Sequence, residues 1–111
     1  MIEEKLTELE FRLLSMLVAG GPSHPYRLGR DVEERSGKGI VTLGALYKAL
    51  HRMEEAGYVE SEWEDVDPHE AKRPRRRTYK VSGAAEPVLI RERQRRRALY
   101  EPAVGGLAWE A

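Results

Sequence analysis

The strongest chemical signal in the sequence is a short run of basic side chains. Five cations lie in the six residues 72–77 around Pro74, namely Lys72, Arg73, Arg75, Arg76 and Arg77. Cations packed this closely repel one another unless a counter-charge is present, and phosphates or the minor groove of nucleic acid supply one. Acidic residues on the N-terminal side could instead neutralise them internally: Glu60, Glu62, Glu64, Asp65, Asp67 and Glu70. Both interpretations hold if binding exchanges internal ion pairs for phosphates.

The net charge of zero conceals an uneven distribution of charge along the chain. Residues 1–71 hold 8 basic and 15 acidic side chains, a net charge of −7, whereas residues 72–97 hold 11 and 2, a net charge of +9. A compact basic block on an otherwise acidic chain indicates a polyanionic partner touched at one restricted face. The 14 Arg against 5 Lys favour bidentate contacts with phosphates or bases, although a genome rich in G and C produces the same bias.

The titratable residues do not form a recognisable catalytic or metal-binding motif. His24, His51 and His69 lie far apart, and the sequence contains no Cys, no H-E-x-x-H motif, no phosphate-binding glycine loop and no nucleophile elbow. Asp67, His69 and Glu70 could be interpreted as a loop metal site, but they lack a fourth ligand and a rigid spacing. We therefore expect a protein that is not an enzyme and that uses no cofactor or metal.

Length and composition predict a single small domain. With 111 residues, 41% apolar and 34% charged, the chain is too hydrophobic to be disordered and too polar to be a membrane protein. Its start, M-I-E-E-K-L, is acidic where a signal peptide would be basic and then apolar. We expect a cytoplasmic protein without a membrane partner, and a domain this small is a ready candidate for sharing its core across a dimer.

The first half of the chain carries signals for three short helices. Thr7 and Glu10 form a T-x-x-E capping box ahead of a helix over residues 8–18. A second helix is expected over residues 25–35, and a third over residues 43–56, with a glycine at the end. The apolar residues expected to face the core in these helices include Leu9, Leu13, Leu14, Leu17, Tyr26, Leu28, Val32, Leu43, Leu46, Leu50 and Met53.

After residue 57 the hydrophobic period changes from helical to alternating. Residues 58–65 alternate Val59, Ser61 and Trp63 with glutamates, as in a strand with one buried face. Residues 75–81 predict a second strand, and the charged segment between the two strands, which contains two prolines, predicts a loop. A last helix is expected from about residue 85 to residue 100 or beyond. This order predicts a winged helix-turn-helix, a mostly α chain with a small β-hairpin wing (α+β), followed by a C-terminal helix.

Three motifs support this layout: G-G-P-S-H-P-Y-R-L, then T-L-G-A-L-Y-K-A-L-H-R-M-E-E-A-G-Y-V-E-S-E-W-E, then R-R-R-T-Y-K-V-S. Over residues 9–82 they resemble the PadR family of bacterial transcriptional regulators, in which the middle motif is the recognition helix and the last one is the wing. The resemblance implies a DNA-binding domain in residues 1–82. The chain departs from the family pattern at Pro25, where the family usually has Gly, and at Ala45, where it usually has Thr.

The third helix is expected to contact DNA with the face opposite its apolar stripe. Small residues and the positive helix end at its N-terminus allow a close approach of the backbone to phosphates. Because Ala45 lacks a hydroxyl, part of the readout shifts to DNA shape. The expected helix contacts are Thr42, Gly44, Ala45, Tyr47, Lys48, His51 and Arg52, and the expected wing contacts are Lys72, Arg73, Arg75 and Arg76. Alternatively, Tyr47 packs against the first helix, and Lys48 and Arg52 are merely solvated charges.

Residues 83–111 are expected to form a dimerisation helix. The run R-E-R-Q-R-R-R, residues 91–97, interrupts its apolar stripe, and Pro102 with Gly105-Gly106 predicts a bend or a frayed end. The family resemblance implies that this helix crosses the first helix of a partner and that aromatic residues near the dimer axis line an effector pocket. The candidate interface and effector residues are Leu99, Tyr100, Val104, Leu107 and Trp109. Alternatively, the terminal Trp109 simply caps the dimer core.

Together, these features predict a sequence-specific transcriptional regulator. It is expected to bind an inverted-repeat operator in double-stranded DNA as a homodimer, and to act as a repressor that a small aromatic or hydrophobic effector releases. The alternative is a winged-helix protein-interaction module whose wing arginines meet an acidic protein partner. A salt titration of duplex binding distinguishes the two, because phosphate contacts give a steep salt dependence.

Overall fold

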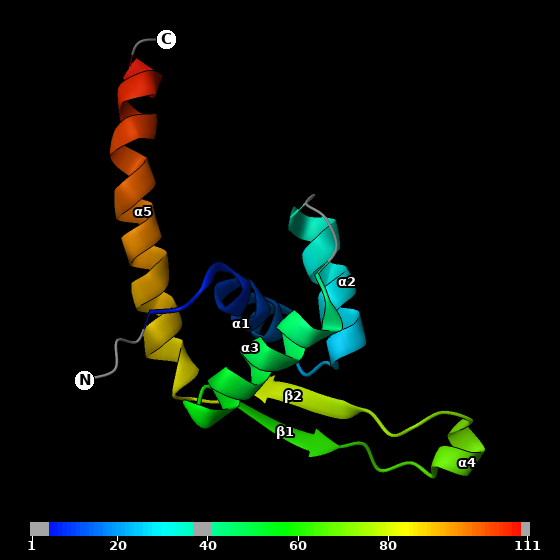
Figure 1. The fold of residues 1–111 in the computed structure, drawn as a ribbon. Coiled ribbons are helices and arrows are strands. Elements are labelled where there is room, and N and C mark those ends of the chain that lie inside the picture. The colour runs from blue at the N-terminus through cyan, green and yellow to red at the C-terminus, as the bar shows by residue number, and fades with distance from the viewer. Residues whose placement is uncertain (1–4, 37–40, 110–111) are drawn as a thin grey trace.

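The computed structural model describes residues 5–36 and 41–109, with side chains placed for residues 5–35 and 41–99. The elements follow one another along the chain as α1 (Glu8–Gly20), α2 (Pro25–Ser36), α3 (Leu43–Glu55), β1 (Val59–Trp63), α4 (Pro68–Ala71), β2 (Arg77–Val81) and α5 (Ala85–Trp109). Strands β1 and β2 form an antiparallel hairpin that extends away from the three helices and carries α4 at its far end (Figure 1). We call residues 59–81 the wing. The expected winged helix is confirmed.

The helix ends form through the caps that the sequence predicts. The Thr7 hydroxyl accepts from the Glu10 amide at 3.2 Å, and the Glu10 carboxylate accepts from the Thr7 amide at 2.8 Å, which completes the capping box. Helix α1 ends at Gly21, whose φ of 80° is a conformation that glycine adopts without strain. The Thr42 hydroxyl accepts from the Ala45 amide at 3.1 Å and caps α3.

The core lies where α1, α2 and α3 meet beneath the start of the hairpin. Its most deeply buried apolar side chains are Leu13, Leu14, Leu17, Leu28, Val32, Leu46, Leu50, Met53 and Val59. Two expected core residues are exposed instead, Tyr26 by 58% and Leu43 by 42%. Pro25 takes the buried position at the start of α2, and Val41 packs against the core ahead of α3. One residue of offset turns a helical side chain by about 100°, which explains why Tyr26 faces away from the core.

The paired strands of the wing attach it to the helices. Val59 pairs with Val81 and Trp63 with Arg77, and the Ser23 amide and carbonyl bond to Tyr79 at 3.0 and 2.7 Å. Val59 is 1% exposed, whereas Trp63 is 59% exposed, because the hairpin has left the core by that point. The predicted strands are therefore confirmed, but the prediction that Trp63 is buried is wrong.

The far end of the wing contains one helical turn that the sequence analysis assigned to a loop. Asp67 accepts from the His69 amide at 2.9 Å, and Pro68 occupies the first turn of α4. Lys72 ends the turn in the left-handed conformation, with a φ of 58°. Asp-Pro is a helix-start signal. The two prolines of this segment favour a loop when both are interpreted as helix breakers, but Pro68 instead begins the helical turn.

Helix α5 is anchored at its start and then leaves the body of the protein (Figure 1). Ala85, Val88 and Leu89 are buried in the core, and α5 runs on to Trp109, past the positions where a bend or a frayed end was expected. The radius of gyration is 16.8 Å, against roughly 13 Å for a compact chain of this size, because α5 and the wing both project. None of the described helices is long and apolar enough to cross a membrane.

Part of the basic run in residues 91–97 attaches α5 to α1. The Arg96 guanidinium lies 2.9 Å from Glu8 and 2.8 Å from Glu92, with its carbon 3.9 Å from the centroid of the Phe11 ring. Glu92 is only 5% exposed, and its hydrogen bond to Arg95, supported by Arg96, lowers its pKa. Arg96 therefore acts as a structural residue.

A glycine substitution tests the crossing of α2 and α3. A Cβ atom at Gly29 would lie 2.7 Å from the Leu46 Cδ1 atom, whereas a Cβ at Gly44 would meet nothing within 4 Å. We expect Gly29→Ala to lower the free energy of unfolding by about 1–3 kcal/mol, because Leu46 is buried and must move. Gly44→Ala is the matched control and should raise it by up to about 1 kcal/mol. Urea denaturation measures both, and equal effects would contradict this packing.

Candidate nucleic-acid interface

The N-terminal half of α3 presents small and uncharged residues to solvent. Thr42, Gly44 and Ala45 are all exposed, and no side chain covers the Gly44 position within 4 Å. The Thr42 oxygen accepts the capping bond, which leaves the hydroxyl proton free to donate to an anion. This end of α3 combines free backbone amides, the positive end of the helix dipole and an open surface, which is the arrangement that binds phosphate.

The next turn of α3 adds longer polar side chains on the same exposed surface. Tyr47 is 44% exposed and is not one of the core side chains that pack α3 against α1. Lys48 is exposed and forms no ion pair within the part of the chain that the structure describes. His51 lies 3.4 Å from Glu55 on the following turn. Lys48 is thus a solvated cation on the open face of α3.

Arg52 differs from the other expected contacts on α3. Its guanidinium forms an ion pair with Glu10 and donates to the Glu10 carboxylate at 2.8 Å and to the Lys5 carbonyl at 3.1 Å. Glu10 is 1% exposed. Burial raises the pKa of Glu10, but the hydrogen bonds from Arg52 and Thr7 outweigh burial and hold it below its ordinary value. Arg52 therefore connects α3 to the start of α1.

The wing holds its cations through contacts with its own backbone and one carboxylate. Arg73 forms an ion pair with Glu64, and the hydrogen bond from Arg73 lowers the pKa of Glu64. Arg75 donates to the Val66 carbonyl at 2.9 Å, and the Arg76 amide donates to Glu64 at 3.0 Å. Internal neutralisation is therefore partial, because Glu64 alone among the acidic residues of the wing pairs with these arginines in the described part of the chain.

His24 lies at the start of α2, close to the charges of the wing. Burial lowers its pKa, and the charges of Arg76 and Arg27 lower it further. Its Nδ1 atom faces the Arg27 amide at 3.4 Å, as an acceptor would. His24 is therefore less protonated than an ordinary histidine at pH 7 and adds little positive charge to this surface.

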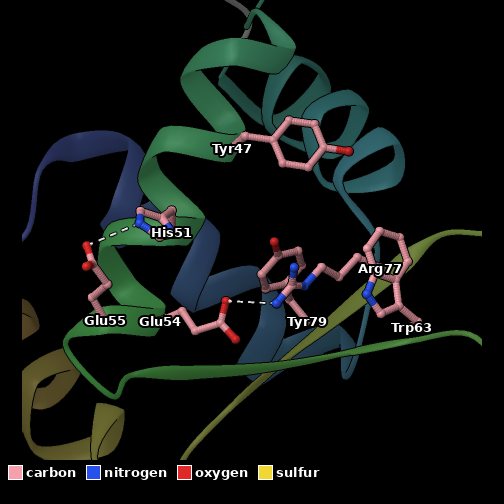
Figure 2. A pocket seen from close by; sticks show the side chains of 7 residues that line it. All are labelled: Tyr47, His51, Glu54, Glu55, Trp63, Arg77 and Tyr79. Atoms are coloured by element: carbon pink, nitrogen blue, oxygen red, sulfur yellow. Dashed lines mark ion pairs between the residues drawn. The ribbon is translucent and has the colours of Figure 1, made fainter.

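A hollow of about 510 Å³ lies between α3 and the wing. Figure 2 shows Tyr47 and His51 of α3 on one side and Trp63 and Arg77 of the hairpin on the other. The sequence does not predict this hollow, because the alternating pattern places Trp63 in the core and the basic run contains Arg77 as one cation among five. Its only signal in the sequence is an aromatic residue close to the end of the first strand.

The expected effector and interface residues fall mostly outside the described side chains. Leu99 is 64% exposed on α5. The side chains of Tyr100, Val104, Leu107 and Trp109 lie outside the described residues, although their backbone belongs to α5. The structure places the helix candidates on α3, the wing candidates between α4 and β2 in the outer part of the wing, and the C-terminal candidates on α5 (Figure 1).

The helix order, the paired hairpin and the open face of α3 define a winged-helix protein. The family model described as "Transcriptional regulator PadR-like family" matches residues 13–86. The chain therefore belongs to the PadR-like family of transcriptional regulators, whose members are regulators and not enzymes. No curated protein matches the chain at a significant level.

Solved structures of low sequence identity share the fold. A PadR family transcription regulator from Clostridium difficile R20291 has a TM-score of 0.73 at 21% identity, covering 91% of this chain and 99% of that one. A PadR family regulator from Eggerthella lenta DSM 2243 has a TM-score of 0.66 at 24% identity, covering 90% and 80%. Bacillus subtilis PadR in complex with operator DNA has a TM-score of 0.62 at 14% identity, covering 75% of this chain and 46% of that one.

The pair of Glu10 and Arg52 predicts a specific pH dependence of stability. At pH 7, Arg52→Met should lower the free energy of unfolding by about 1–3 kcal/mol, because it leaves a buried carboxylate without its cation. Since the native pKa of Glu10 is lowered, its stabilising contribution is present above about pH 4.3, the unfolded value, and is lost as the pH falls through the native pKa. The decrease in the free energy of unfolding caused by Arg52→Met should therefore be smaller near pH 3 than at pH 7.

Urea denaturation at both pH values measures this effect. Arg12→Met is the matched control, because Arg12 pairs with the exposed Glu8 at 2.9 Å on the surface of α1. A loss at pH 7 that is equal in the two variants, or that does not change with pH, would contradict a structural role for the pair.

Proposed function

We propose that the chain binds double-stranded DNA, with the N-terminal half of α3 in the major groove and the wing along the adjacent backbone and minor groove. The observation that carries this proposal is the open, small-residue start of α3 next to the exposed Lys48, which forms no ion pair with any described residue. Bacillus subtilis PadR, solved with operator DNA, shares the fold and supports the proposal. The acidic partner of the alternative hypothesis has no comparable support.

The proposed contacts divide into two groups. Tyr47, Lys48 and His51 reach base edges or phosphates from α3, and the start of that helix contributes backbone amides with Thr42, Gly44 and Ala45. The wing contributes Lys72, Arg73, Arg75 and Arg76 to phosphates. We assign Arg52 to the positioning of α3, because its guanidinium bonds to Glu10 and Lys5.

We also propose that the protein is a homodimer that binds an inverted repeat. One winged helix contacts too few base pairs for useful specificity, and two copies would place their recognition helices about one turn of DNA apart, roughly 34–36 Å. The projecting α5 supports this, since it leaves the core with Leu99 exposed (Figure 1). An isolated helix projecting this far gains little from its own propensity, and a partner helix would stabilise it.

We also propose that a small effector regulates DNA binding. A repressor released by a small aromatic or hydrophobic effector fits a dimer whose helix spacing depends on how the two α5 helices pack. The proposed effector contacts are Leu99, Tyr100, Val104, Leu107 and Trp109. In a Trp63→Phe variant, whose emission comes from Trp109, phenolic compounds should quench fluorescence and weaken operator binding over the same concentration range. Quenching without a loss of affinity for the operator would contradict regulation by the effector, and the protein would then be a constitutive DNA binder.

The division between helix and wing predicts two different mutant phenotypes. Lys48→Ala should weaken binding to a duplex selected from a random pool by about 5- to 100-fold and weaken binding to random duplex much less, because a base contact carries sequence information. Replacing Arg73, Arg75 and Arg76 together by Ala should weaken both duplexes alike and reduce the salt slope by up to about three phosphate contacts. Fluorescence anisotropy at several salt concentrations measures both.

Arg93→Ala is the matched control, since it removes one exposed cation that belongs to α5 and not to α3 or the wing. Equal losses from the helix and wing variants on both duplexes would show that specificity resides elsewhere. No duplex binding at low salt would favour the protein-interaction module.

The dimer has its own test. Light scattering at micromolar concentration should give twice the chain mass of 12.7 kDa. Leu99→Asp should shift the protein towards the monomer, because it places a charge on the exposed apolar side of α5, whereas Gln94→Asp on the same helix should not. A monomeric wild type that binds duplex one to one would contradict the proposal.

A further inference from the structure

The hollow between α3 and the wing has a lining that is unusual for a surface that meets DNA. Its walls combine three aromatic rings, two carboxylates and two basic side chains, contributed by Tyr47, His51, Glu54, Glu55, Trp63, Arg77 and Tyr79 (Figure 2). Both carboxylates come from the C-terminal end of α3. The two carboxylates disfavour phosphates at this end of α3. The DNA contacts proposed above account for Tyr47 and His51 but leave the exposed ring of Trp63 beside a carboxylate unexplained.

Trp63 is the most exposed of the Tyr and Trp rings that line the hollow. It is 59% exposed, and Tyr47 on the opposite wall is 44% exposed, whereas Tyr79 at the base is 4% exposed. Neither exposed ring contributes to the core. Two aromatic faces across a concave surface provide the apolar contact area of a small-ligand site, and ring faces attract cations.

The chain's own Arg77 shows which chemistry the hollow accepts. Its guanidinium carbon lies 5.5 Å from the centroid of the Trp63 ring, and its Nη2 atom lies 3.7 Å from the Glu54 carboxylate. Its Nε atom donates to the Ser61 hydroxyl at 2.8 Å, and that hydroxyl donates to Glu54 at 2.6 Å. A planar cation between an aromatic face and a carboxylate is therefore already present as part of the protein.

The contacts of Arg77 leave room for an external cation to replace it. The distance of 3.7 Å to Glu54 is near the upper limit for an ion pair, and the Arg77 side chain remains 39% exposed. If Arg77 turns outwards, Glu54 keeps its bond from Ser61 and offers a second oxygen. His51 is engaged by Glu55 at 3.4 Å on the far wall.

We propose that this hollow binds a small planar organic cation, with its aryl ring against Trp63 and its cationic group at Glu54 in place of the Arg77 guanidinium. Occupancy would also exclude duplex DNA, because Tyr47 and His51 line the hollow and belong to the proposed DNA-contacting face. This second consequence rests on the proposed function, whereas the binding itself does not. The site is separate from the effector residues proposed on α5.

Fluorescence of a Trp109→Phe variant tests the binding in the absence of DNA. Its emission comes from Trp63 alone, since the chain has two Trp. Titration with benzamidinium should give a saturable change in emission, whereas benzamide, its neutral isostere, and benzoate should bind at least about tenfold more weakly. Equal responses to the three probes, or a linear unsaturable quench by benzamidinium, would overturn the proposal.

Two substitutions in this background separate the cation site from a general aromatic contact. Glu54→Gln should weaken benzamidinium binding by about five- to tenfold, because it removes the charge and keeps an acceptor for Ser61. Arg77→Met should strengthen it, since the internal competitor is lost. Glu62→Gln is the matched control on β1, because Glu62 is exposed and does not line the hollow. Circular dichroism confirms folding, and unchanged affinity in both Glu54→Gln and Arg77→Met would refute the assignment.

A DNA competition experiment then tests the second consequence. Benzamidinium should lower the affinity of the wild type for the selected duplex over the concentration range in which it binds Trp63, and the loss should be smaller in Glu54→Gln. If benzamidinium binds but the affinity for DNA does not fall, the cation site is upheld and the proposed exclusion of DNA is refuted. A protein that binds no duplex at low salt would refute the proposed function, while the fluorescence titration would still decide the cation site.

Discussion

One buried carboxylate joins the start of the fold to α3. Glu10 accepts from the Thr7 amide, which fixes the first turn of α1, and the same carboxylate receives the guanidinium of Arg52 from α3. Because Glu10 is 1% exposed, a loss of its partner would leave a charge inside the protein. The orientation of α3 relative to α1 is thus held by a charge-assisted contact in addition to the packing of leucines.

Two further contacts fix the wing relative to this helix frame. The backbone of Ser23 pairs with Tyr79 at the base of the hairpin, and Arg77 reaches Ser61 and Glu54 further out. Beyond these contacts the hairpin is free of the core, so its far end is shaped locally by α4 and by the pair of Arg73 and Glu64. The far end of a wing attached in this way can move without disturbing the core.

Helix α3 carries opposite electrostatics at its two ends. Its start offers amides, small residues and Lys48, whereas its last turn offers Glu54 and Glu55 beside the aromatic hollow. The first end suits a polyanion and the second a cation. This polarity concentrates the proposed DNA contacts at the N-terminal half and gives a small cation access to the same face of the protein.

The sequence alone determined the order of the elements other than α4, the caps of α1 and α3, and the basic run of residues 72–77. These depend on neighbours within a few residues, such as Thr7 with Glu10 and Thr42 with Ala45. Tertiary structure decided which apolar residues of a periodic pattern are buried. Trp63 follows the alternation of a buried strand, yet the hairpin leaves the core before reaching it. Likewise, Arg52 has the spacing of a DNA contact, but a carboxylate 42 residues earlier binds it. Local periodicity encodes neither the point at which the hairpin leaves the core nor the contact between Arg52 and Glu10, because both depend on how distant segments pack.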